Sequence, residues 1–290
     1  MLLALIKTMR PRQWTKNVFV FAALVFDKQL FLPDSFLRTL SGFLLFCLVS
    51  SSVYIFNDLA DIEADRQHPE KRLRPIPSGK LPIPAAWFGG ILLVIVSLVC
   101  GWLLSASFAM VIAAYFLLNL AYSQWLKHVL ILDVLILAAG FVLRVDAGVR
   151  LIQVERFSPW LYVVMTLLAL YLGFGKRRAE LALLTDDASN HRKVLQGYTV
   201  PLLDQYIMIV SGMTVVGYSL YTFSAPNLPE NHSMMLTIPF VVYAIFRYLY
   251  LIEVEHSGGA PEEILLSDRP LQASMLLWAA AVLAVFYLSR

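Results

Sequence analysis

Three aspartates at helical spacing follow an apolar run that ends at Phe56. Asp58, Asp61 and Asp65 stand at i, i+3 and i+7. A helix that continues through Asp65 would place the three carboxylates on one face, with Asn57 beside them and Glu63 pointing away. Like charges on one face repel one another and need counter-ions, and Mg²⁺ typically bridges a few carboxylates to substrate phosphates. The spacing therefore predicts that Asp58, Asp61 and Asp65 hold Mg²⁺.

Basic side chains follow the aspartates closely, between residues 66 and 80. They are Arg66, Lys71, Arg72, Arg74 and Lys80. Such cations suit phosphate oxygens, and we expect Arg72 and Arg74 to bind substrate. Charged residues after a membrane helix are often only a solvated loop, and a single D-x-x-D pattern occurs by chance. Three aspartates in register beside Asn57 favour a diphosphate site at a membrane edge.

The composition is that of a membrane protein. Of the 290 residues, 59% are hydrophobic and 15% are charged, whereas soluble domains have about 45–50% apolar and about 25% charged residues. The apolar residues come in blocks of about 17–25, the length that spans a bilayer as a helix. We therefore predict an all-α, polytopic membrane protein in which residues 1–290 form one domain. No Walker loop, dinucleotide fingerprint or histidine cluster occurs, and we expect no nucleic-acid partner.

Nine segments are candidates for membrane spans. Their ranges are 15–32, 38–57, 83–104, 107–123, 130–151, 159–175, 202–223, 234–253 and 271–288. Asp27, Lys28 and Pro33 interrupt the first of these segments.

Positive charge alternates between the connections of these spans. Lysine and arginine gather before the first span, in 57–80 and in 176–201, and the connection with Arg150 and Arg156 is the exception to the alternation. The positive-inside rule places the N-terminus and both charge-rich connections in the cytoplasm and the C-terminus outside. We expect a multi-pass protein of the cell membrane whose active site faces the cytoplasm, since a single site needs both connections on one side.

A second polar cluster, G-F-G-K-R-R-A-E, covers residues 173–180 at the end of the sixth predicted span. On a continuing helix Lys176 and Glu180 stand at i and i+4, and Arg177 lies near Glu180 at i+3. The cations either anchor the helix on the cytoplasmic side or bind substrate. The glutamate on the same face and the paired glycines favour binding.

Ionisable residues within predicted spans are functional candidates, because charge in hydrocarbon is costly. Arg144 has room to reach an anionic group in a central cavity, and we expect it to bind substrate. A pair between Arg144 and Asp146 is less natural, since i and i+2 do not face each other on a helix. Asp133 stands near an interface, and Arg247 could equally join an ion pair within the helix bundle.

Two further polar residues stand at the ends of predicted spans. Lys16 belongs to R-P-R-Q-W-T-K-N, which leads into the first span, and is a candidate for binding phosphate. Tyr122 stands at the cytoplasmic end of the fourth span. It is a candidate for binding substrate, although a place in the aromatic belt also accounts for it.

The pattern N-D-x-x-D-x-x-x-D at the end of a second membrane helix resembles the UbiA-type intramembrane prenyltransferase superfamily. Typical members carry a second motif, D-x-x-x-D, after the sixth span, and use both motifs to bind a prenyl diphosphate through Mg²⁺. The resemblance implies nine helices around a central cavity that opens to the cytoplasm and laterally to the bilayer. Here K-R-R-A-E stands in place of the second pair of aspartates, which argues against ordinary aromatic prenyl transfer.

This departure matches one branch of the superfamily. R-P-R-Q-W-T-K-N, N-D-L-A-D-I-E-A-D-R, L-D-V-L-I-L-A-A-G-F-V-L-R, G-K-R-R-A-E-L and D-R-P-L look like the decaprenyl-phosphate phosphoribosyltransferases. The resemblance implies Mg²⁺-dependent transfer of 5-phosphoribosyl from 5-phosphoribosyl 1-diphosphate (PRPP) to a polyprenyl phosphate. Pyrophosphate is released, and the product leads towards lipid-linked arabinose for a cell envelope. The functional residues of the branch fall on Asn57, Asp58, Asp61, Asp65, Lys176, Arg177 and Glu180, and also on Lys16 and Arg144.

The charge balance agrees with this branch. The donor carries a diphosphate and a 5-phosphate and the acceptor another phosphate, so the site needs more cations than one for a prenyl diphosphate and a neutral ring. We expect Asp58 and Asp61 to act in catalysis through the metal, with Lys176 and Glu180 as the catalytic pair of the second motif. The acceptor phosphate is ionised near neutral pH, so no strong general base is required.

Other functions remain alternatives on the sequence. The nearest is transfer of a prenyl group from a prenyl diphosphate to an aromatic acceptor. A transporter or lipid carrier would use intramembrane charges for passage, but the inverted repeats expected there are not evident. A purely structural subunit does not account for three aligned carboxylates, and a homo-oligomer stays open.

Overall fold

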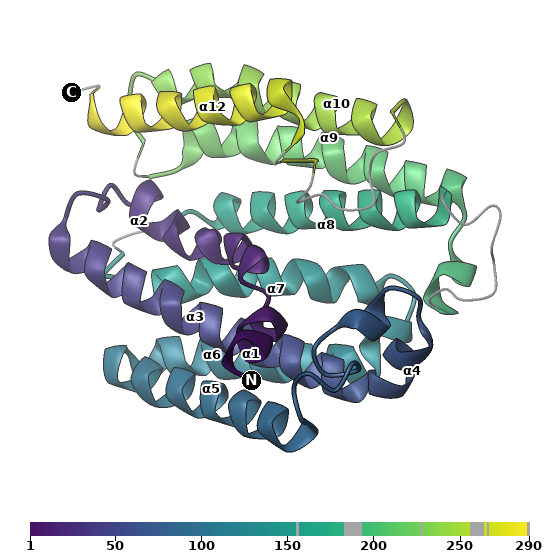
Figure 1. The fold of residues 1–290 in the computed structure, drawn as a ribbon. Coiled ribbons are helices and arrows are strands. Elements are labelled where there is room, and N and C mark those ends of the chain that lie inside the picture. Colours follow the sequence, from purple (N-terminus) through teal and green to yellow (C-terminus); the bar gives the residue numbers. More distant parts are fainter. Residues whose placement is uncertain (155–156, 183–192, 227, 256–263, 266, 289–290) are drawn as a thin grey trace. The chain divides into compact units, whose positions relative to one another are not determined.

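The computed structural model describes residues 1–154, 157–182, 193–226, 228–255, 264–265 and 267–288. Within these residues all regular elements are helices (Figure 1). Seven described segments are long and apolar enough to cross a membrane. They are α3 (Pro33–Ala60), α5 (Ile83–Leu104), α6 (Ala106–Gln124), α8 (Pro159–Ala182), α9 (Val200–Ser224), Ser233–Glu253, which joins η6 (Ser233–Thr237) to α10 (Ile238–Glu253), and α12 (Arg269–Tyr287). The prediction of an all-α polytopic membrane protein is confirmed.

Large apolar side chains point outward from these helices. Trp102 and Leu103 of α5 are 63% and 79% exposed, and Met208 of α9 is 71% exposed. Contiguous apolar surface of this kind is unfavourable in water and is favourable against lipid tails. The outward faces therefore fit a bilayer.

The predicted ranges locate these helices well. The helix α5 coincides with the predicted span 83–104. The helix α3 is longer than its predicted span at both ends, since Pro33 starts it at a position that proline favours and its last turn includes Asn57 and Asp58. The helix α8 continues to Ala182 and therefore contains the whole cluster 173–180.

The other two predicted spans are not among the seven apolar segments. The range 15–32 holds the 3₁₀-helix η1 (Pro11–Phe21) and the short α2 (Ala22–Phe26) in place of one long α-helix. Lys28 then takes a left-handed backbone with φ of 58°, which L-residues rarely adopt within a helix. The range 130–151 forms α7 (Leu132–Val149), which carries three ionisable residues and is not among the seven apolar segments. The nine-span arrangement stays a prediction.

The helices group into two compact units. Unit 1 comprises residues 1–126 and 143–155, and unit 2 comprises residues 127–142 and 156–290. Helix α7 begins in unit 2 and ends in unit 1. The expectation of one domain over residues 1–290 stays a prediction.

In unit 1 the end of α7 lies directly against η1. A Cβ at Gly148 would collide with the carbonyl oxygen of Val20, and a Cβ at Gly42 of α3 would collide with the side chain of Leu151. At Gly148 only glycine permits the two backbones to approach so closely. These contacts hold the last turns of α7, with Arg144, beside η1 and α3.

The N-terminal helix α1 (Leu2–Met9) also belongs to unit 1 and is fixed on α3. The hydroxyl of Ser51 in α3 donates to the Met9 carbonyl at 3.1 Å and accepts from Trp14 Nε1 at 3.0 Å. Arg10 stands between α1 and η1 with φ of 52°. Its position next to the end of α3 follows from these anchors.

Unit 2 has a core of aromatic and aliphatic side chains from α8, α9, α10 and α12. Tyr171, Phe174, Leu203, Ile207 and Tyr248 are among its buried members. Gly175 of α8 lies against Tyr248 and Ile252. The C-terminal half of α8 is therefore fixed in this core, and with it the polar cluster 176–180.

Candidate functional site

The first aspartate motif lies where α3 ends and α4 (Ile62–Gln67) begins. Asp61 forms the break, with φ of −96° and ψ of 12°. The Asp61 N–H donates to the Asn57 carbonyl at 3.0 Å, and the Asp65 N–H donates to the Asp61 carbonyl at 2.8 Å. The expected unbroken helix is therefore two helices, but i→i+4 hydrogen bonding continues across the break. Asp58 and Asp65 consequently stay on one side, as predicted.

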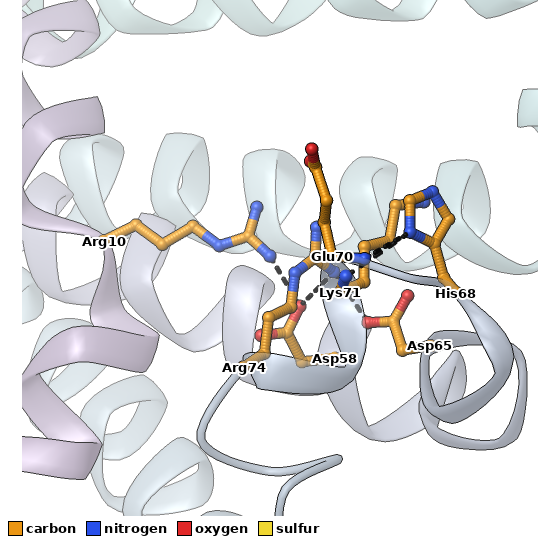
Figure 2. Close-up of polar contacts among 7 residues, drawn as sticks. All are labelled: Arg10, Asp58, Asp65, His68, Glu70, Lys71 and Arg74. Carbon is orange, nitrogen blue, oxygen red and sulfur yellow. Dashed lines mark hydrogen bonds and ion pairs between the residues drawn. The ribbon is translucent and has the colours of Figure 1, made fainter.

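Two arginines hold these carboxylates, as Figure 2 shows. Arg74 Nη1 lies 3.2 Å from Asp58 Oδ1 and 2.7 Å from Asp65 Oδ2. Arg10 Nη2 lies 2.6 Å from the same oxygen of Asp58. The carboxylate side chains are only 3% and 4% exposed, whereas those of Arg10 and Arg74 are 31% and 32% exposed. The carboxylates therefore form the floor of the site and the guanidinium groups lie between them and solvent.

A short loop brings Arg74 over the carboxylates. His68 Nδ1 accepts the backbone N–H groups of Glu70 and Lys71 at 3.2 and 3.4 Å, which shapes the turn into η2 (Lys71–Leu73) (Figure 2). Beyond Arg74, the buried side chains of Ile76 and Leu81 pack with those of α3 and α5. The loop is therefore attached to the helices of unit 1, and Arg74 is placed by it.

The other residues predicted for this motif take different positions. Asp61 and Asn57 are half-buried, and Glu63 is exposed and pairs with Arg66 at 2.9 Å, so it points away as predicted. Asn57 Oδ1 is buried and has no hydrogen-bond partner within the described residues. Arg72 is exposed in η2, and the arginine that contacts the aspartates is Arg74.

The donor set fits a hard divalent cation. One guanidinium nitrogen contacts an oxygen of Asp58 and an oxygen of Asp65, so a single cation can bridge both carboxylates. The nearby Asn57 Oδ1 is a further oxygen of the kind that Mg²⁺ prefers. Among the described residues no three His, Cys, Asp or Glu side chains converge closely enough to hold a metal unaided. A Mg²⁺ ion at this place would take its remaining ligands from substrate phosphates and water.

Arg144 forms a second polar cluster in unit 1. Its Nε donates to Asn17 Oδ1 at 2.8 Å and its Nη2 donates to the Tyr115 hydroxyl at 2.9 Å. The guanidinium also lies over the rings of Tyr115 and Phe46, at 4.8 and 5.5 Å from their centres. Arg144 is 6% exposed and Asn17 is fully buried. Asp146, two residues further along α7, pairs with Arg150 at i+4.

The second motif forms a buried network in unit 2. Arg177 is 1% exposed, and its Nε donates to Asp133 Oδ2 while its Nη1 donates to Glu180 Oε2, both at 2.7 Å. The Tyr198 hydroxyl donates to Asp133 Oδ1 at 2.8 Å and accepts the Ile131 N–H at 2.9 Å. Burial, followed by the bond to Asp133, raises the pKa of the Tyr198 phenol above its ordinary value. Tyr198 therefore stays a hydrogen-bond donor at neutral pH.

The other charged residues of the cluster 173–180 point in different directions from α8 and have different partners. The ion pair of Glu180 is with Arg177, the i+3 neighbour, and Lys176 is half-buried on α8. Arg178 turns to another side, where its Nε donates to Asp204 Oδ1 at 2.7 Å and its Nη1 to the Ile252 carbonyl at 3.2 Å. Arg178 therefore joins α8 to α9 and α10.

Two predicted substrate-binding residues lie at other helix ends. Lys16 is half-buried in η1, one residue before Asn17, and Tyr122 is half-buried in the last turns of α6. Arg247, left open on the sequence, pairs with Asp268 at 2.7 Å. The same aspartate caps α12 by accepting the Leu271 N–H, so this pair fixes a helix terminus.

Several site residues escaped the sequence argument. Arg10 stands 48 positions before its partner Asp58, and Tyr198 and Asp133 are 65 positions apart. Asn17 and Tyr115 are also distant in sequence from Arg144. The available signals were indirect: Arg10 and Asn17 lie within R-P-R-Q-W-T-K-N, and Asp133 is an ionisable residue in an apolar segment.

Comparison with known proteins decides the family. A model of the UbiA prenyltransferase family matches residues 17–261, which is most of the chain. The chain belongs to the UbiA prenyltransferase family. Solved UbiA structures share its fold: a UbiA homolog from Archaeoglobus fulgidus bound to DMAPP and Mg²⁺ has a TM-score of 0.75 and 19% identity, covering 98% of this chain and 99% of that one. The same homolog bound to GPP and Mg²⁺ gives a TM-score of 0.74 and 18% identity over the same shares.

Within the UbiA family, curated relatives match over nearly the whole chain. The decaprenyl-phosphate phosphoribosyltransferase of Mycolicibacterium smegmatis is 37% identical over 98% of this chain and 93% of its own length. The protein of the same name from Mycobacterium tuberculosis is 35% identical over 96% and 92%. That from Corynebacterium glutamicum is 33% identical over 98% and 87%. These relatives carry the name of the branch that the motifs resemble.

Proposed function

We propose that this chain transfers the 5-phosphoribosyl group of PRPP to a polyprenyl phosphate and releases pyrophosphate. The observation that carries the proposal is the 33–37% identity, over nearly the full length, to three relatives named decaprenyl-phosphate phosphoribosyltransferase. The product, a polyprenylphosphoryl 5-phosphoribose, would lead towards lipid-linked arabinose for a cell envelope. A decaprenyl chain is the acceptor that the names of these relatives suggest.

The second motif supports this reaction over prenyl transfer. UbiA members that bind a prenyl diphosphate through two aspartate-rich motifs need carboxylates at both. Here the second motif supplies Arg177, whose guanidinium lies between Asp133 and Glu180, and the neighbouring Lys176. Lys176 and Arg177 in place of two aspartates make this motif less negative, which suits a donor and an acceptor that together carry three anionic centres.

The transfer is a substitution at C1 of the ribose. The bond from C1 to the diphosphate oxygen breaks, its electron pair leaves with pyrophosphate, and an oxygen of the acceptor phosphate forms the new bond to C1. Asp58, Asp61 and Asp65 would hold Mg²⁺, which neutralises charge on the departing pyrophosphate. The acceptor phosphate is already ionised at neutral pH, so the residues around it need only bind and orient it.

Polar side chains would then bind and orient the two substrates. We assign donor and acceptor phosphates to Lys16, Arg72, Arg74, Arg144 and Lys176, with Asn57 and Tyr122 as hydrogen-bonding partners of the substrates. Arg177 and Glu180 form a rigid pair, because Asp133 fixes the guanidinium from the other side. This pair would hold the second motif in a constant position.

The topology that serves this reaction has nine crossings. Seven of the crossings are the apolar segments, and the η1–α2 segment and α7 would be the other two. We place the helices around a central cavity open to the cytoplasm, where PRPP is available, and laterally to the bilayer, where the polyprenyl chain resides. The protein would then be a multi-pass protein of the cell membrane.

A membrane assay tests the proposed function. Membranes containing the protein are supplied with radiolabelled PRPP, polyprenyl phosphate and Mg²⁺, and label is measured in the organic phase. We expect label to enter that phase and to be lost when EDTA is added. Turnover of a prenyl diphosphate with an aromatic acceptor, and none of PRPP, would establish the alternative, which the prenyl-diphosphate complexes of the UbiA homolog favour.

A further inference from the structure

The buried carboxylates of the first motif are already neutralised by the protein itself. Asp58 and Asp65 face two guanidinium groups, so the four side chains carry no net charge. A divalent cation cannot take the same carboxylate oxygens while both arginines keep them. A cation that bridges Asp58 Oδ1 and Asp65 Oδ2 must therefore displace Arg74, whose Nη1 contacts both of these oxygens.

We propose that Arg10 and Arg74 are exchangeable counter-ions. In the absence of substrate they neutralise Asp58 and Asp65. When a divalent cation takes the carboxylates, both guanidinium groups turn to the oxygens of the diphosphate. The inference deepens the proposed function, and it rests on the part that concerns a metal and a diphosphate.

Burial decides which partner moves. The two carboxylates are almost fully covered, while about a third of each arginine side chain is exposed. Arg74 follows η2 on a loop whose anchors, Ile76 and Leu81, lie downstream. Its side chain can leave the carboxylates without moving the helices, because long arginine side chains keep several rotamers at a surface.

Arg10 has a second contact that keeps it in the site. Its guanidinium lies 4.9 Å from the centre of the Tyr54 ring, an arrangement in which a cation is attracted by the aromatic face. Its backbone has a φ of 52° and is followed by Pro11, a conformation that is unfavourable for a non-glycine residue. A strained backbone that aims a cation at Asp58 is the kind of feature found at functional sites.

The charge balance makes metal and diphosphate depend on each other. A divalent cation added to the neutral set leaves two positive charges in excess, and a diphosphate supplies the negative charge that compensates them. The displaced guanidinium groups gain charge-assisted bonds to phosphate oxygens in exchange for those to carboxylate oxygens. Each ligand therefore raises the affinity for the other by the same factor.

Binding of Mn²⁺ to the purified protein tests the exchange. Free Mn²⁺ is followed by electron paramagnetic resonance, with and without inorganic pyrophosphate, for the wild type and Arg74→Gln. We expect the wild type to bind Mn²⁺ weakly alone and about 5–150-fold more tightly with pyrophosphate. Arg74→Gln removes the competing cation and a diphosphate contact, so it should bind Mn²⁺ alone about tenfold more tightly and lose most of the enhancement.

Two further variants serve as a control and as a second test of the exchange. Arg66→Gln is the matched control, because Arg66 pairs with the exposed Glu63 of the same short helix, and it should behave as the wild type. Arg10→Gln should tighten Mn²⁺ binding less than Arg74→Gln, because the ion pair of Arg10 is with Asp58, whereas Arg74 contacts both aspartates. It also keeps the inference testable if Arg74→Gln does not fold.

Two results of the Mn²⁺ measurement would overturn the exchange. If Arg74→Gln and Arg10→Gln bind Mn²⁺ alone no more tightly than the wild type, the arginines do not compete with the metal and the exchange is wrong. Absence of Mn²⁺ binding with pyrophosphate present overturns it as well. Pyrophosphate is the product of both phosphoribosyl and prenyl transfer, so the exchange can stand when the PRPP assay fails, and the reverse also holds.

Discussion

At the scale of single residues, the first motif combines a predictable part with an unpredictable one. Helical spacing of aspartates was sufficient to expect Asp58 and Asp65 on one side, and their common contact with Arg74 agrees with it. Spacing could not reveal that Arg10 is the other partner of Asp58. That contact depends on a left-handed backbone between two N-terminal helices and on how these pack against α3.

Neutralising one carboxylate of the first motif should remove the reaction. Asp58→Asn keeps the shape of the side chain but loses the charge that would hold the metal. We expect the rate of phosphoribosyl transfer per folded protein to fall by about 10²-fold or more, the usual effect of losing an electrostatic stabiliser of the transition state. The rate is measured in the membrane assay and the amount of inserted protein by immunoblot.

Glu63→Gln is the control for this change, because Glu63 is 77% exposed and pairs with Arg66 on the outer side of α4. It should retain the wild-type rate. Comparable rates for Asp58→Asn and Glu63→Gln would remove the first motif from the mechanism.

At the scale of elements, the end of α8 is held by successive arginines that point to different neighbours. Arg177 binds Asp133 of α7, and Arg178 binds Asp204 of α9 and the Ile252 carbonyl of α10. The sequence K-R-R-A-E predicts that these residues share a helix. It does not show that Arg177 belongs to the buried network while Arg178 joins three helices. The partner of each arginine depends on how distant helices pack.

Glu180→Ala and Arg178→Ala should therefore have different effects. Glu180→Ala frees one side of the Arg177 guanidinium, and we expect the transfer rate per folded protein to fall at least about tenfold. Arg178→Ala should lower stability by about 1–2 kcal/mol, because partly buried bonds to Asp204 and a carbonyl are lost, and should keep most of the rate. Rate per folded protein and melting temperature in detergent separate the two. Equal losses of rate would make the second motif a charged anchor.

The hydroxyl of Tyr198 connects the segment before α9 to the start of α7, and its effect should depend on pH. Tyr198→Phe removes a bond to Asp133 and leaves the Ile131 N–H without its acceptor. We expect a loss of about 1–3 kcal/mol at neutral pH.

Folding raises the pKa of this phenol because the residue is buried and bonded to Asp133. A group whose pKa rises on folding contributes its stability fully below its unfolded pKa, about 10 for tyrosine, and loses it as the pH rises towards the folded pKa. The difference in melting temperature between wild type and Tyr198→Phe should therefore be constant from pH 7 to 9 and shrink above about pH 10. A difference that grows above pH 10 would contradict this assignment.

At the scale of the whole molecule, apolar length and composition were enough to predict a helical membrane protein, and seven of the nine predicted ranges recur as apolar helical segments of the described structure. The prediction of membrane spans was weakest where charged residues interrupt an apolar stretch. Around Asp27 and Lys28 the chain turns, so no single long helix forms there. In α7 the ionisable residues are satisfied by distant partners, which local sequence does not show.

Whether α7 crosses the membrane decides if both motifs can serve one site. Between the connection 57–80 and the segment after α8, the helices α5, α6 and α8 alone would carry the chain across an odd number of times. The motifs would then face opposite compartments. A crossing by α7 brings them to the same side. Its charges do not forbid this, because Asp133 is bound by Arg177 and Tyr198, and Arg144 by Asn17 and Tyr115, and paired ionisable groups are tolerated within a bundle.

Labelling of single cysteines with a membrane-impermeant maleimide distinguishes the two topologies. Ser78 and Gln196 are exposed and follow the first and second motifs, and Asn231 is exposed beyond α9. We expect Ser78→Cys and Gln196→Cys to react from the cytoplasmic side, in inverted vesicles, and Asn231→Cys to react from the other side in intact cells. The wild type, with buried Cys47 and half-buried Cys100, gives the background. Reaction of Ser78→Cys and Gln196→Cys from opposite sides would mean that α7 does not cross, and a single site formed by both motifs would then be excluded.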